Sequence, residues 1–86
     1  MLEKTQIEAE AFIDQWLASQ DDKSVQMPEQ IAFIARCETG GYLVVDNEGG
    51  ECLVEEAETR EIAIKWLKLE IDLEELYELN EKVRIN

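Results

Sequence analysis

Residues 30–55 read QIAFIARCETGGYLVVDNEGGECLVE, and this stretch decides the fold. From residue 31 to 38 the side chains alternate in a period of two, which predicts a strand with Ile31, Phe33, Ala35 and Cys37 on one face. The glycine pairs at 40–41 and 49–50 provide the backbone freedom that short hairpin turns need. The stretch therefore predicts an antiparallel meander with return strand Tyr42–Val45 and third strand Glu51–Glu55.

A helix is expected in front of this meander. Thr5-Gln6-Ile7-Glu8 has the S/T-x-x-E form of a capping box, in which the two side chains satisfy backbone N–H groups at a helix start. Apolar residues then recur at helical spacing at Ala9, Phe12, Ile13, Trp16 and Leu17. The polar stretch from Gln20 to Gln26 predicts the end of the helix near Gln20.

The C-terminal part is helical, with two interpretations open. Thr59 can cap a helix, and Asp72 can cap a second helix that runs to about Lys82. Alternatively, residues 59–83 form one helix with a seam of residues that recur at alternating intervals of four and three positions. A polar residue in such a seam would set the register of a coiled coil. That seam consists of Ile62, Trp66, Leu69, Leu73, Leu76, Asn80 and Val83. Lys82–Ile85 is a candidate short final strand.

These elements predict one small domain over residues 1–86 of the α+β class. It has an N-terminal helix, a three-stranded antiparallel β-meander and one long or two short C-terminal helices. The inner face of the meander needs a helix to cover it. The residues expected in or beside the core are Trp16, Trp66, Phe12, Phe33, Val44 and Leu53.

The composition is strongly acidic. Of the 86 residues, 21 are Asp or Glu and 8 are Lys or Arg, which gives a formal net charge of -13. This field disfavours direct binding to nucleic acid or to an anionic membrane, and it favours a basic partner protein. No apolar stretch approaches the ~20 residues that cross a bilayer, and the N-terminal residues lack a leader pattern. A cytoplasmic location is therefore expected.

Side chains for catalysis are few. The chain has no His, so an enzyme is not expected, and no cofactor or metal site is predicted. The oxygen-rich segment Asp46–Glu51 fits a hairpin turn better than a calcium loop. Cys37 and Cys52 are expected as small buried apolar side chains rather than as a disulfide.

The distribution of carboxylates is the one feature that indicates a function. Neighbouring carboxylates lie ~5–6 Å apart on a helix and ~6–7 Å apart on one strand face, which resembles the spacing of successive phosphates. The predicted function is a stoichiometric inhibitor that occupies the basic nucleic-acid-binding surface of a partner, such as an antitoxin, an immunity protein or a phage-type anti-defence protein. The predicted partner-binding residues are Glu51, Glu55, Glu56, Glu58, Glu74, Glu75, Glu78 and Glu81.

Two further observations bear on function. The run from Gly40 to Leu69, with two hairpin strands followed by Glu58-Thr59-Arg60-Glu61-Ile62-Ala63 leading into an apolar helix, resembles the strand-strand-helix part of HicB-type antitoxins. The resemblance implies an antitoxin and covers about a third of the chain. The alternative prediction is a homodimeric regulatory or assembly module, in which acidity serves only solubility. Its contact would use Leu69, Leu73, Leu76 and Tyr77.

Overall fold

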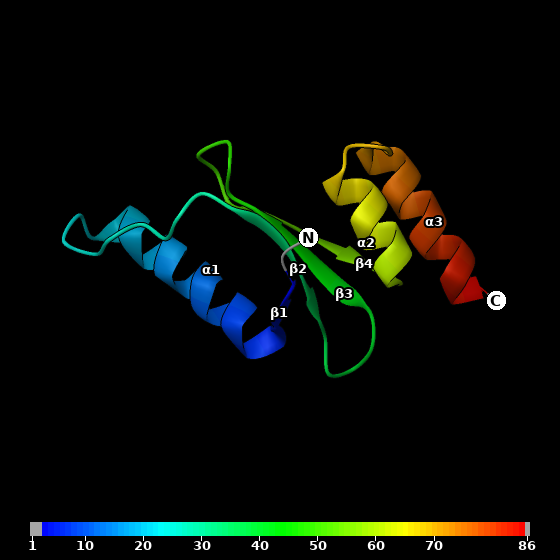
Figure 1. Cartoon of the computed structure of the whole chain (residues 1–86), viewed down its shortest axis with the longest axis horizontal. Helices are drawn as coiled ribbons and strands as arrows, with labels where there is room; N and C mark the ends of the chain where they lie inside the picture. Colours follow the sequence, from blue (N-terminus) through cyan, green and yellow to red (C-terminus); the bar gives the residue numbers. More distant parts are fainter. Residues whose placement is uncertain (1–2, 86) are drawn as a thin grey trace.

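The computed structural model describes residues 3–85 and shows an α+β arrangement (Figure 1). A four-stranded sheet has the order β1-β2-β3-β4. In chain order the elements are β1 (Glu3–Thr5), α1 (Gln6–Asp21), β2 (Ala32–Arg36), β3 (Tyr42–Asp46), β4 (Leu53–Ala57), α2 (Arg60–Leu67) and α3 (Leu73–Ile85). The predicted α+β class is confirmed. The predicted span 1–86 includes residues 1, 2 and 86, which lie outside the described residues.

The sheet is mixed, which corrects the prediction of three antiparallel strands. The β2-β3-β4 meander is present, with Ile34 opposite Val44 and Val44 opposite Glu55. A further strand, β1, pairs with β2 in parallel and aligns Glu3 with Ile34. Three residues are too few to show a period of two, so no alternation in the sequence marked this strand. The third strand also begins two residues later than predicted, because the turn extends through Cys52.

The start of α1 follows the predicted capping box. The backbone N–H of Glu8 donates to the Thr5 hydroxyl at 3.2 Å, and the Thr5 N–H donates to the Glu8 carboxylate at 3.1 Å. Because Thr5 also ends β1, the chain passes from strand to helix without a loop. The helix ends at Asp21, one residue beyond the predicted end.

Both faces of the sheet are covered, because alternate residues of the central strands are apolar on each side. Phe33, Ala35 and Val45 pack against α1, where the rings of Phe12 and Phe33 meet edge to face with centroids 5.0 Å apart. Ile34 and Val44 pack on the opposite side with residues of α2 and α3. The molecule thus has three layers, with α1 at one end, the sheet in the middle and α2–α3 at the other end (Figure 1). Its extents along the three principal axes are 47 × 25 × 22 Å.

Two helices, not one, follow the sheet. The single-helix interpretation is wrong because α2 ends at Leu67, and Leu69 adopts the left-handed backbone conformation with φ 61°. The N–H of Glu70 turns back to the carbonyl of Lys65 at 2.9 Å. Asp72 then caps α3 as predicted, since its carboxylate accepts from the N–H of Glu75 at 2.8 Å.

The last turn of α3 contains the segment considered as a final strand, and that prediction is wrong. Helix α3 continues through Ile85 because its apolar stripe keeps helical spacing to the end. The core prediction is correct for Phe12, Phe33 and Val44. Leu53 is 53% exposed, since it begins an edge strand that no helix covers at that end. Trp66 packs beside the α2–α3 cluster, and Trp16 is half-buried.

Candidate protein-binding site

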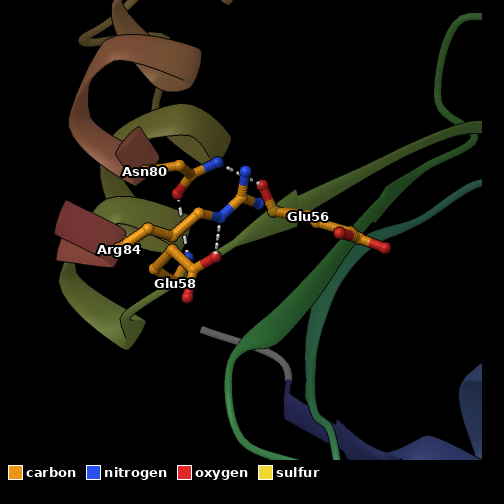
Figure 2. A network of polar contacts seen from close by, with 4 residues as sticks. All are labelled: Glu56, Glu58, Asn80 and Arg84. Atoms are coloured by element: carbon orange, nitrogen blue, oxygen red, sulfur yellow. Dashed lines mark hydrogen bonds and ion pairs between the residues drawn. The ribbon is translucent and has the colours of Figure 1, made fainter. Parts of the chain in front are cut away.

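Helix α3 is anchored to the edge of the sheet by one buried amide. Asn80 is 3% exposed, and its Nδ2 donates to the carbonyl of Glu56 at 2.9 Å. Its Oδ1 accepts from the backbone N–H of Glu58, also at 2.9 Å (Figure 2). The side-chain amide of Asn80 therefore bonds to β4 in the way that a neighbouring strand would. These two bonds satisfy backbone groups that lie in a partly buried place.

A second contact beside Asn80 joins the two segments. The guanidinium of Arg84 on α3 donates to the carboxylate of Glu58 (Figure 2). The hydrogen bond and the charge of Glu58 raise the pKa of the Arg84 guanidinium above its ordinary value. About two turns before Arg84 on α3, the Tyr77 hydroxyl lies 3.5 Å from a carboxylate oxygen of Glu55. Residues 77–84 of α3 thus run alongside residues 55–58.

A cleft of about 670 Å³ separates α3 from β4. Glu55 points toward the α2–α3 layer and Val54 toward the α1 layer, since successive strand residues alternate in direction. Both line the same cleft, so the cleft follows the edge of β4 rather than one face of the sheet. Its lining residues are Val54, Glu55, Glu56, Tyr77, Asn80, Glu81 and Arg84.

The surroundings of this cleft are strongly negative. Residues 46–58 contain six acidic side chains and residues 70–81 contain six more, with no Lys or Arg in either stretch. Arg84 is the cation in the lining, and Glu58 already balances its charge. Three carboxylates of the lining, those of Glu55, Glu56 and Glu81, form no ion pair among residues 3–85. A cation approaching the cleft would therefore be attracted.

The structure brings together part of the predicted set. Glu55, Glu56 and Glu81 line the cleft, and Glu58 lies at its end in the ion pair with Arg84. Glu74 and Glu78 precede Glu81 by about two turns and one turn on α3, so they extend the acidic surface along the helix.

Two predicted residues lie apart from the cleft. Glu75 shares a flank of α3 with Lys82, because seven residues make two helical turns. The β3–β4 turn contains Glu51. The prediction missed Asn80 as an anchor of α3. A signal was available, because Asn80 lies one helical turn after Leu76 in the apolar stripe, and a polar side chain in such a stripe needs a hydrogen-bond partner.

The two cysteines are free, half-buried thiols. Burial raises the pKa of Cys37 above its ordinary value, and the negative charges of Glu56 and Glu10 add to this effect. Burial and the charge of Asp46 raise the pKa of Cys52 as well. Both sulfurs therefore stay protonated at neutral pH, where a thiol is a poor nucleophile and a poor metal ligand.

Metal ions have no candidate site, and membranes no candidate spanning helix, within residues 3–85. Within residues 3–85, no group of three or more His, Cys, Asp or Glu side chains is placed to hold a metal ion. No helix in the same residues has both the length and the apolar character for crossing a membrane. Comparisons with protein families, with curated proteins and with solved structures gave no match. The resemblance of Gly40–Leu69 to HicB-type antitoxins stays a prediction.

Proposed function

We propose that this protein binds a basic surface of a partner protein through the acidic face of β4 and α3, and acts as a stoichiometric inhibitor of that partner. The observation that carries the proposal is the cleft at the sheet edge. Its carboxylates without an ion pair come from two segments, β4 and α3, that are distant in sequence. A partner that normally holds nucleic acid in a cationic groove has the matching charge. An antitoxin, an immunity protein or a phage-type anti-defence protein would work in this way.

The geometry of the acidic face supports imitation of a nucleic-acid backbone. Glu74, Glu78 and Glu81 are spaced by helical turns, which puts neighbouring carboxylates ~5–6 Å apart on one side of α3. Glu55 and Glu56 add charge along the adjacent strand. Glu55 and Glu56 point to opposite faces of β4, so they add negative charge on both sides of its edge, and a groove lined with Lys and Arg would attract this surface over several ångströms of approach.

The proposal is tested with two variants that change the net charge equally. The cleft variant carries Glu55→Gln, Glu56→Gln and Glu81→Gln. The control variant carries Glu10→Gln, Asp14→Asn and Asp21→Asn, which are exposed residues of α1 at the other end of the molecule. Partner protein is captured from lysate at low salt, identified by mass spectrometry and purified. Association rates are then measured by stopped-flow fluorescence.

The wild type and the α1 control should associate rapidly, with a rate that falls about tenfold or more from low to high salt. The cleft variant should be slower and less sensitive to salt. A single-stranded oligonucleotide should compete with the wild type for the partner. Equal rates for all three proteins, or an association rate indifferent to salt, would contradict the proposal.

A second candidate function is the homodimeric module, and the exposure of apolar residues around the start of α3 favours it. Leu69 is 83% exposed, Leu73 42% and Tyr77 54%. Leu76 is fully buried in the protein's own core, so it is removed from the predicted contact. Sedimentation of the wild type and of Leu73→Glu decides this candidate. A dimer that Leu73→Glu dissociates supports it, and a wild-type monomer at high concentration rules it out.

A further inference from the structure

The outer edge of β4 presents unused backbone groups. Asn80 bonds to the Glu56 carbonyl and the Glu58 N–H, so the even-numbered residues of β4 direct their backbone groups away from β3. By the same alternation, the N–H and carbonyl of Val54 and the N–H of Glu56 point outward. Within residues 3–85 these three groups make no hydrogen bond with a side chain or with another backbone segment. They form a row beside the cleft.

This edge lacks Pro and Lys, two of the devices that usually prevent pairing with another strand. Natural edge strands are shortened, interrupted by Pro or bulges, or carry Lys. Strand β4 has five residues with neither Pro nor Lys, and its first residues, Leu53 and Val54, are 53% and 39% exposed. Its protection consists of negative charge, from Glu55 and Glu56. Such protection repels acidic strands and admits basic ones.

Two kinds of strand could pair with this edge: β4 of a second copy of the protein, or an extended basic segment of a partner. Charge favours the second. Antiparallel pairing of β4 with β4 of a second copy would bring Glu55 and Glu56 of one chain against the same residues of the other. Like charges directly opposite each other destabilise a strand pair. An extended segment rich in Lys or Arg would instead place cations against these carboxylates and against Glu81.

We propose that β4 accepts an extended, basic segment of the partner protein as a fifth strand. This inference rests on the proposed function and specifies the form in which the partner binds. Backbone hydrogen bonds to Val54 and to the Glu56 N–H supply the pairing, and the carboxylates of the cleft select a cationic sequence. Asn80 already occupies the Glu56 carbonyl and the Glu58 N–H, so the added strand ends beside Glu56.

The first test uses synthetic peptides. One is a seven-residue peptide that alternates Lys and Val, capped at both ends. The other has the same sequence with every backbone amide N-methylated, so that it keeps the charge and cannot donate backbone hydrogen bonds. Calorimetric titration should show binding of the first peptide and a loss of about tenfold or more in affinity for the second.

The second test changes the protein without changing its charge. Val54→Pro removes the outward N–H, and an edge strand tolerates Pro when that N–H faces away from the ladder. Val54→Thr is the matched control, since it keeps the N–H. The Pro variant should lose about tenfold or more in affinity for the first peptide, while Val54→Thr should retain binding. Circular dichroism checks that both variants are folded.

Amide hydrogen exchange keeps the inference testable if Val54→Pro fails to fold. In the free wild-type protein the amides of Val54 and Glu56 should exchange rapidly, and those of Glu55 and Ala57 slowly, because the latter face β3. Adding the Lys-Val peptide should slow the amide exchange of Val54 and Glu56. Peptide binding that leaves these two amides unprotected, or that tolerates N-methylation, overturns strand addition and leaves the acidic face as the binding surface. If neither peptide binds and no basic partner associates, the proposed function fails as well.

Discussion

The two edge strands of the sheet are shielded in different ways. Strand β1 has three residues. Glu3 pairs with Arg60 of α2 at 3.6 Å, and the Lys4 ammonium lies 5.5 Å from the centre of the Phe33 ring on β2. The cleft beside it is lined by Lys4 and Arg36 as well as Glu38. Strand β4 is longer, carries two carboxylates and meets an acidic cleft.

The difference shows how one sheet can close one edge and keep the other available. A short, cation-bearing strand is a common way to prevent unwanted pairing. At β4 the carboxylates serve the same purpose against copies of this acidic chain, while a basic strand is not excluded. The buried amide of Asn80 closes only the C-terminal end of this edge.

The largest expected effect concerns that amide. Asn80→Leu should destabilise the protein by about 2–4 kcal/mol, because the Glu56 carbonyl and the Glu58 N–H would lose their partners in a partly buried place. Chemical denaturation measures the change in the free energy of unfolding. Asn80→Asp keeps an acceptor for the Glu58 N–H but places a carboxylate oxygen against the Glu56 carbonyl, so it should be destabilised as well. A loss of less than about 0.5 kcal/mol in Asn80→Leu would show that α3 is held by its apolar contacts alone.

The sequence predicts the β-meander better than it predicts the break between the two C-terminal helices. The meander of β2, β3 and β4 follows from alternating apolar residues and from glycine turns, where Gly40 and Gly50 adopt positive φ of 94° and 92°. The break between α2 and α3 has no glycine to mark it, because Leu69 occupies a left-handed conformation that usually takes Gly, and its one sequence signal is the Asp72 cap.

Pattern alone could not select among the carboxylates. Helical spacing groups Glu74, Glu78 and Glu81, and strand position groups Glu55 with Glu56. Which side of α3 faces β4 depends on a long-range contact, the bond of Asn80 to the β4 backbone. Glu75, on the flank that it shares with Lys82, was therefore indistinguishable in sequence from the carboxylates that line the cleft.

At the β1 edge the largest single effect should come from the helix cap. Thr5→Ala removes the hydroxyl that accepts from the Glu8 N–H, and should cost about 1 kcal/mol of unfolding free energy. Thr5→Ser retains the hydroxyl and is the control. Thermal denaturation of the two variants compares them. If both variants lose equal stability, the methyl group of Thr5 matters and the cap does not.

The ion pair at the same edge should contribute less. The side chains of Arg60 and Glu3 are 50% and 41% exposed, so water and salt screen their attraction. Arg60→Ala should change the unfolding free energy by about 0–1 kcal/mol, well below the effect of Asn80→Leu. A double-mutant cycle with Glu3→Gln isolates the pair. A coupling energy above about 1 kcal/mol would mean that β1 is held by charge rather than by its ladder and the contacts of α1.

The smallest expected effect is a change in the pKa of Glu8 at the junction of β1 and α1. The Thr5 backbone N–H, followed by its hydroxyl, lowers the pKa of Glu8 below the ordinary value of 4.5. The folded protein therefore holds this proton less tightly than the unfolded chain. The contribution of Glu8 to stability is complete above the unfolded pKa and is lost as the pH falls through the folded pKa.

Thr5→Ala should raise the pKa of Glu8 only part of the way to 4.5, because the backbone N–H of residue 5 remains as a donor. Titration of the side-chain carboxyl carbon by NMR measures both proteins, with Glu10 as an internal reference on the same helix. A Glu8 pKa in Thr5→Ala equal to that of the wild type would remove the hydroxyl from this interaction. The Glu8 carboxylate would then interact with the backbone N–H of residue 5 alone.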